Sequence, residues 1–219
     1  MENFSVLAAQ IAQIALGGIV TLKLFLLTLL LAIPLGLALA LMRLSCWQPL
    51  SLLINGYIWL MRGTPLMLQM LFIYFGLPIL FPGLTIAAFP AAAIAFSLNY
   101  AAYFAEIFRG GIQSIGKGQR EGAKALGFSY AQTMRKIILP QMVKKILAPF
   151  GNETITLVKD TSLVYVLAIY DLLKVAANIV NREFTIVPFL VAAVFYLVMT
   201  LLLTLLFQRL EKRYAVYDD

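Results

Sequence analysis

Long stretches without a charged residue constrain this chain more than any other feature. Residues 24–42 and 184–208 contain no Asp, Glu, Lys or Arg, and each stretch has about the length of one membrane crossing. The stretch 63–105 is also free of charge, but it is too long for a single crossing. Because Pro82 and Gly83 interrupt it, we predict two crossings that are joined by a short turn.

The composition excludes a water-soluble domain. Hydrophobic residues make up 62% of the 219 residues and charged residues only 12%, whereas soluble domains are near half apolar and a quarter charged. A further hydrophobic segment, residues 146–170, follows the third crossing. It has spanning length although it contains Glu153, Lys159 and Asp160. We therefore predict an all-α membrane protein, a single domain over 1–219, with five transmembrane helices near 16–42, 58–78, 86–108, 146–168 and 186–208.

The basic residues predict the orientation. Eight of the 17 Lys and Arg residues lie in the segment 109–145, and the C-terminal segment 209–213 adds three more. The positive-inside rule places both segments in the cytoplasm, so five crossings put the N-terminus outside and the C-terminus in the cytoplasm. The net charge of +7 is accounted for in this way, and we expect the lipid bilayer, and no nucleic acid, as a partner.

The missing residue types exclude several kinds of site. The chain has no His and one Cys, which argues against a bound metal and against His-based catalysis. Residues 111–117 imitate a phosphate-binding G-x4-G-K loop. The next residue, however, is Gly118, which has no hydroxyl group for magnesium, and a predicted transmembrane helix precedes the motif where a strand is needed. We expect no cofactor, no metal and no catalytic residue on this chain.

The predicted cytoplasmic loop, near 112–140, has the pattern of two short helices. Residues 121–126 favour a helix that Gly127 would end, and Ser129 can cap a second helix over 130–138. Two interpretations remain open at this point. The loop is either a compact docking surface for another protein or an amphipathic linker that lies on anionic lipid.

Ionisable groups inside predicted spans are costly and call for a partner or a function. Glu153 and Asp160 are two helical turns apart and share a face of the fourth span, and Glu106 shares a face of the third span with Asn99. Lys159 can reach a neighbouring carboxylate. An ion pair that Lys159 and Asp160 form within the bundle or between subunits is therefore one interpretation, and a polar pocket or water path around Glu153 is another.

The second span carries a predicted break. Gly63 frees the backbone, Thr64 can act as an N-cap, and Pro65 suits the first position of a new helix. The N–H groups at such a helix start would face a carboxylate, and Gln69 lies one turn further along. The alternative is an ordinary kink after a surface helix, with the side chain of Arg62 reaching the interface.

Residues 121–140 resemble a known family motif. The order Glu-Gly-Ala, three residues, Gly127, nine residues and then Ile-Ile-Leu-Pro is similar to the EAA loop of ABC-importer permeases, E-A-A-x3-G-x9-I-x-L-P. Gly122 departs from the pattern, although one small residue replaces another. Further similarity to the polar amino-acid permease branch covers residues 62–66, 99–109, 151–153, 159–163 and 210–213.

The resemblance implies the fold of a type I ABC-importer permease in a bacterial cytoplasmic (inner) membrane. It implies an ATP-binding-cassette ATPase dimer that carries ATP and Mg, a second copy of this permease or a similar one, and an extracytoplasmic amino-acid-binding protein. The loop would be the coupling helix that docks on the ATPase. The docking residues carried over from the family are Gly118, Glu121, Gly122, Ala123, Ala125, Leu126 and Gly127.

The resemblance also implies a mid-membrane pocket for a polar amino acid, basic or amide in type. The candidate binding residues are Gly63, Thr64, Leu66, Gln69, Asn99, Glu106, Glu153, Asp160 and Ser162. A proton-coupled secondary transporter that uses Glu106, Glu153 and Asp160 is the alternative, and it would need no ordered docking loop.

Overall fold

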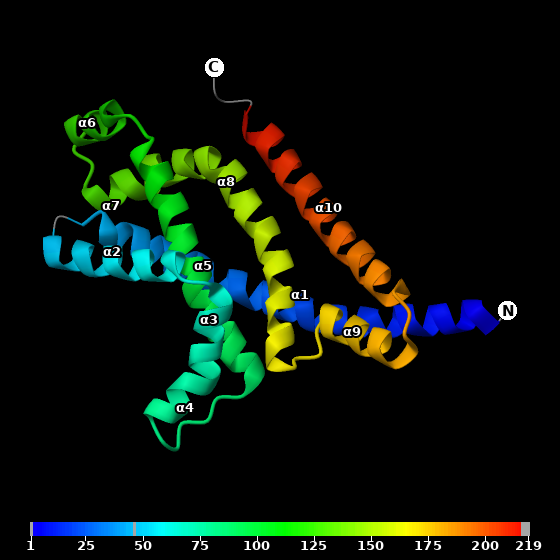
Figure 1. The fold of residues 1–219 in the computed structure, drawn as a ribbon. Helices are drawn as coiled ribbons and strands as arrows, with labels where there is room; N and C mark the ends of the chain where they lie inside the picture. Colours follow the sequence, from blue (N-terminus) through cyan, green and yellow to red (C-terminus); the bar gives the residue numbers. More distant parts are fainter. Residues whose placement is uncertain (1, 46, 216–219) are drawn as a thin grey trace.

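The computed structural model describes residues 2–45 and 47–215, and every regular element in these ranges is a helix (Figure 1). The elements are α1 (Glu2–Arg43), α2 (Gln48–Gly63), α3 (Leu66–Leu71), a π turn (Phe72–Gly76), α4 (Leu77–Leu80), α5 (Ala88–Gln113), α6 (Lys117–Ala125), α7 (Tyr130–Thr133), a second π turn (Met134–Ile138), α8 (Leu139–Asp160), a 3-10 turn (Thr161–Leu167), α9 (Leu172–Glu183) and α10 (Val187–Ala215).

Three described helices can cross a membrane without interruption. They lie in α1, α5 and α10, and the long α1 contains the whole of the first predicted span. Two further spans form only if each bent helix pair counts as one crossing. The pair from α2 to α4 bends by 104°, and the pair from α7 to α9 bends by 53°. The structure thus contains three to five candidate spans, and the count of five remains a prediction.

The break in the second span lies one residue later than the sequence predicted. Thr64 and Pro65 are both extended, and α3 begins at Leu66. The prediction that Thr64 caps the new helix is wrong, because its hydroxyl donates backwards to the Leu60 carbonyl at 2.8 Å. Proline accounts for the extended Thr64, since it disfavours helical geometry in the residue before it. Pro65 is itself extended, so the first helical residue is Leu66.

The loop 112–140 is ordered as the sequence predicted. Gly127 follows α6 with a left-handed φ of +77°, which a residue with a side chain adopts only with strain. Ser129 and Gln132 form a reciprocal capping box at the start of α7. The second helix is not separate, however, because α7 continues through the π turn into α8. A movement of this loop therefore acts directly on α8.

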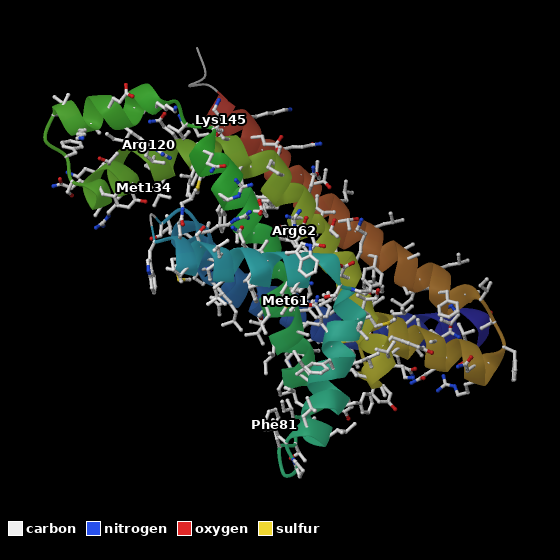
Figure 2. All side chains as sticks on the ribbon, turned by 60° about the vertical axis from the view of Figure 1, so that its left-hand side comes forward. Met61, Arg62, Phe81, Arg120, Met134 and Lys145 are labelled. Atoms are coloured by element: carbon white, nitrogen blue, oxygen red, sulfur yellow. The ribbon has the colours of Figure 1, made fainter. Side chains whose placement is uncertain are left out.

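The helices pack around α5, which contacts α1, α2, α3 and α8. Gly36 of α1 permits a close approach, since a Cβ there would lie 2.9 Å from Phe104 Cβ. Figures 1 and 2 place α6, α7 and the end of α10 at one end of the molecule and the turn after α4, marked by Phe81, at the other. The predicted orientation requires this separation.

Candidate functional site

A polar cavity of about 540 Å³ opens beside the break between α2 and α3. The end of α2, the start of α3, the middle of α5 and the second half of α8 form its walls. Its volume lies in the range that small-molecule sites occupy. The lining residues are Arg62, Gly63, Thr64, Pro65, Leu66, Asn99, Tyr100, Tyr103, Glu153, Thr156, Asp160 and Leu163.

The structure brings six of the nine candidate binding residues to this cavity. They are Gly63, Thr64, Leu66, Asn99, Glu153 and Asp160. Gln69 lies behind the wall and hydrogen-bonds to Asn99. Glu106 lines a neighbouring hollow near the end of α1, and Ser162 lines a hollow between α8 and α10. Glu106 and Ser162 therefore face away from the cavity that the other candidates share.

Gln69 and Asn99 hold the helix break together. The amide nitrogen of Gln69 donates to the carbonyl oxygen of Met61 at 2.9 Å and to the hydroxyl of Thr64 at 2.7 Å. The amide nitrogen of Asn99 donates to the same Met61 carbonyl at 2.9 Å and to Gln69 Oε1 at 3.0 Å. A helix that ends at a break leaves carbonyl groups without partners. The side-chain amides of Gln69 and Asn99 donate hydrogen bonds to such carbonyl groups. Their N–H groups therefore stabilise the break and are already engaged before any ligand binds.

The two carboxylates of α8 differ in their partners. Tyr100 of α5 donates a hydrogen bond to Asp160 at 2.7 Å. Glu153 lines the same cavity two turns away on the same helix. In the described part of the chain Lys159 forms no ion pair with Asp160, because its side chain lines the hollow that contains Ser162. The interpretation of these neighbours as an ion pair within the bundle is therefore wrong for the single chain, and a pair between subunits stays a prediction.

Glu106 is the centre of an arginine cluster near the C-terminal end of α5. Its Oε1 pairs with Arg43 of α1, and its Oε2 accepts hydrogen bonds from Arg109 Nε at 3.0 Å and Nη2 at 2.7 Å. Arg62 Nη1 lies further away, at 3.8 Å from Oε1. The cluster ties the ends of α1, α2 and α5 together, and it occupies both carboxylate oxygens of Glu106.

Sequence reasoning missed Arg62, Tyr100 and Tyr103 as lining residues. Arg62 directly precedes the break, and a charge at a break was the available signal. Tyr100 follows Asn99 in the chain but gave no separate signal, because only the crossing of α5 and α8 brings it to Asp160. No group of three or more His, Cys, Asp or Glu residues in the described ranges could hold a metal ion.

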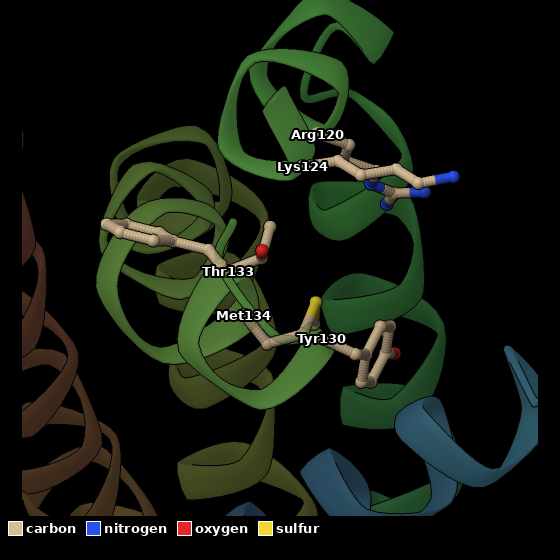
Figure 3. Close-up of a pocket in the computed structure, with 6 residues that line it drawn as sticks. Arg120, Lys124, Tyr130, Thr133 and Met134 are labelled. Carbon is tan, nitrogen blue, oxygen red and sulfur yellow. The ribbon is translucent and has the colours of Figure 1, made fainter. Parts of the chain in front are cut away.

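The predicted docking residues lie at the tip of the molecule. Ala123 is buried against the rest of the loop, while Gly118, Glu121, Gly122, Ala125, Leu126 and Gly127 are exposed. Leu126 is 76% exposed. Figure 3 shows a hollow in the same loop, with Arg120 and Lys124 from α6 on one side and Tyr130, Thr133 and Met134 on the other.

Comparisons with known proteins identify the architecture. The model of the family described as "Binding-protein-dependent transport system inner membrane component" matches residues 32–216. The arginine transport system permease protein ArtQ of Bacillus subtilis (strain 168) is 38% identical over 217 residues, covering 99% of each chain. The glutamine transport system permease protein GlnP of Escherichia coli (strain K12) is 42% identical over 161 residues, covering 73% of this chain and 74% of that protein.

Solved structures agree with the family match. A chain of an amino acid ABC transporter crystallised with histidines superimposes with a TM-score of 0.85 at 39% identity, over 92% of this chain and 94% of that one. An inward-facing MetNI methionine ABC transporter superimposes with a TM-score of 0.73 at 15% identity, over 98% of both chains. The second likeness concerns the fold alone.

Proposed function

Because this chain belongs to the family of binding-protein-dependent transport system inner membrane components, we propose that its α2–α3 cavity carries a basic amino acid across the membrane. The chain is a multi-pass permease subunit of an ABC importer and is not the ATPase. Family membership implies ATPase and binding-protein partners. The substrate, the binding residues and the orientation are the parts that we propose.

The charges in the cavity favour a basic substrate, and this is the observation that carries the proposal. Glu153 and Asp160 contribute two negative charges and Arg62 one positive charge, so the lining is net negative. A basic amino acid has two cationic groups and one carboxylate, and it complements this set group for group. A neutral amide amino acid would leave one half-buried carboxylate unpaired, which costs free energy. The names of the two relatives, arginine and glutamine permeases, agree with a polar amino acid.

We further propose that the inner end of the molecule docks on the ATPase. The exposed Leu126 and the small exposed residues before and after it form a knob, on a helix that is otherwise charged, and a cleft of the ATPase would cover this knob. The partner ATPase dimer, and not this chain, would bind ATP and Mg. Because α7 runs on into α8, a displacement of the knob would tilt the helix that carries both Glu153 and Asp160. In this arrangement the basic loop and the C-terminus are cytoplasmic and the N-terminus is outside.

A second permease copy completes the path in our proposal. Asn152 and Lys159 lie two turns apart on α8 and are both exposed in the single chain, at the depth of the predicted fourth span. Polar side chains at this depth rarely face lipid. Another copy of this chain, or a similar permease, would cover this face. Symmetric pairs are the commonest form of such assembly.

Reconstitution in proteoliposomes tests the function. With the companion ATPase and binding protein, we expect ATP-dependent uptake of radiolabelled L-arginine. Asp160→Asn should reduce this uptake at least about tenfold, since it removes a charge-assisted contact. Glu211→Gln, near the end of α10, is the matched control and should leave uptake unchanged. Uptake that a pH gradient drives in the absence of the ATPase would refute the proposal and support the proton-coupled alternative.

A further inference from the structure

We propose that the guanidinium group of Arg62 binds the α-carboxylate of the transported amino acid. This assignment rests on the function proposed above and adds a specificity-determining residue to it. Arg62 is the last residue before the break at Gly63, and it lines the polar cavity. Figure 2 places Arg62 in the middle of the molecule, next to Met61, where α2 meets the helices that form the cavity.

Arg62 belongs to two adjoining spaces. It lines the cavity that holds Glu153 and Asp160, and it also lines the neighbouring hollow that holds Glu106 and Arg43. Its side chain is 43% exposed, whereas those of Arg43 and Arg109 are 21% and 28% exposed. Of the three arginines near Glu106, Arg62 is therefore the one that a ligand in the cavity can reach.

The charge balance leaves Arg62 with binding capacity. Three guanidinium groups surround the single carboxylate of Glu106, whose oxygens already pair with Arg43 and Arg109. The distance of 3.8 Å from Arg62 to this carboxylate is too long for a hydrogen bond. Arg62 is thus the surplus cation of the cluster. An incoming carboxylate can pair with it without displacing either of the closer ion pairs.

Tyr103 holds the guanidinium plane in position. The Arg62 guanidinium carbon lies 5.2 Å from the centre of the Tyr103 ring, within the range of a cation–π contact. A guanidinium group that stacks by its face keeps its N–H edge for a planar partner, and a carboxylate matches that edge with two parallel hydrogen bonds.

The two carboxylates complete the recognition. Glu153 and Asp160 lie on α8, and Arg62 lies at the end of α2, so the cavity has an acidic wall and a basic wall. An amino acid that lies between them directs its α-carboxylate to Arg62 and its ammonium group to α8. This arrangement requires a free α-carboxylate on the substrate, whatever the side chain is.

A pair of ligands that differ only in the carboxylate tests the proposal. The permease–ATPase complex in nanodiscs is titrated with L-arginine and with agmatine, its decarboxylated form, in the absence of the binding protein, which could select for the carboxylate itself. We expect the unaltered complex to bind L-arginine about tenfold or more tightly than agmatine. In Arg62→Ala the two ligands should bind within about twofold, through loss of L-arginine affinity. Arg62→Lys should keep part of the preference.

Arg209→Gln is the matched control, because it removes an equal charge at an exposed position of α10 and lines neither space, and it should keep the preference for L-arginine. Co-purification of the ATPase shows that each variant is folded. A preference that survives in Arg62→Ala, or equal binding of both ligands by the unaltered complex, overturns the assignment. If the unaltered, reconstituted transporter shows no ATP-dependent uptake of L-arginine, the proposed function itself is refuted.

Discussion

Helices α5 and α10 are both long enough to cross a membrane, but their surroundings are opposite. In the most apolar part of α5, 72% of the residues are buried inside the protein, against 6% in α10. Yet α10 is the more hydrophobic of the two, with a mean hydropathy of 2.6 against 1.3. Of these two helices, the one with the stronger apolar signal is left uncovered by the protein, and the one with the weaker signal lies in its core.

The difference follows from the solvent. Lipid tails are as apolar as leucine, so burial of a leucine between helices in a membrane gains little, and close packing of small side chains drives association. The buried face of α5 is accordingly rich in alanine, with Ala101, Ala102 and Ala105 fully buried. The surface of α10 carries large side chains such as Leu197 and Leu202, which are 67% and 62% exposed. The protected helix can also carry polar residues such as Asn99.

The contact of α1 with α5 should be the most sensitive to size. A Cβ at Gly36 would lie 2.9 Å from Phe104 Cβ and 3.0 Å from the Ala101 carbonyl oxygen. We expect Gly36→Leu to lower the free energy of unfolding by about 3 kcal/mol or more, because α1 must move away from α5. Thermal unfolding of the purified permease measures this. Gly56→Leu, where no atom lies within 4 Å of a Cβ, is the control, and similar losses for both variants would contradict the packing argument.

Polar contacts of α5 should rank next. Asn99→Leu removes two hydrogen bonds that support the break between α2 and α3. We expect a loss of about 1–3 kcal/mol in unfolding free energy, since part of the freed backbone loses its partner. The exposed Asn181→Leu, on α9, controls for the change of side chain. Full stability of Asn99→Leu would show that Gln69 alone holds the break.

The hydrogen bond from Tyr100 to Asp160 should contribute less. Tyr100→Phe removes the hydroxyl that meets Asp160 at 2.7 Å and keeps the buried ring. Hydrogen bonds between membrane helices average about 0.6 kcal/mol, so we expect a loss of roughly that size. The exposed Tyr170→Phe should change nothing measurable. A loss above about 2 kcal/mol would indicate that Asp160 depends on this partner for burial.

Truncation on α10 should have the smallest effect. Leu202→Ala exposes no cavity inside the single chain, and we expect a change within about 0.5 kcal/mol for the separated permease. The same substitution at the buried Leu157 of α8 should cost about 2–5 kcal/mol. If Leu202→Ala instead weakens a permease pair, another protein surface covers α10, and its low burial describes the single chain only.

Local signals were predictable where one residue type decides the outcome. The capping Ser129 and the terminating Gly127 defined the ends of the loop helices, and both functions are present in the structure. The break in the second span was predicted from Gly63 and Pro65, although the helix begins at Leu66. The separation of Glu106 from the other candidates was not predictable. Helical periodicity gives the face of a residue but not the arginines that neighbouring helices bring to it.

The sequence by itself determined that the chain belongs in a membrane, where its long apolar segments lie, and that residues 117–138 form an ordered helical loop. These properties depend on composition, periodicity and caps, which act over a few residues. Only the tertiary structure decided which polar groups meet. The crossing of α5 with α2 and α8 brings Arg62, Tyr100 and Asp160 to one cavity. Gln69 instead hydrogen-bonds to the backbone at the helix break. The reason is geometric, since contacts between helices depend on crossing angles and close packing that no single segment encodes.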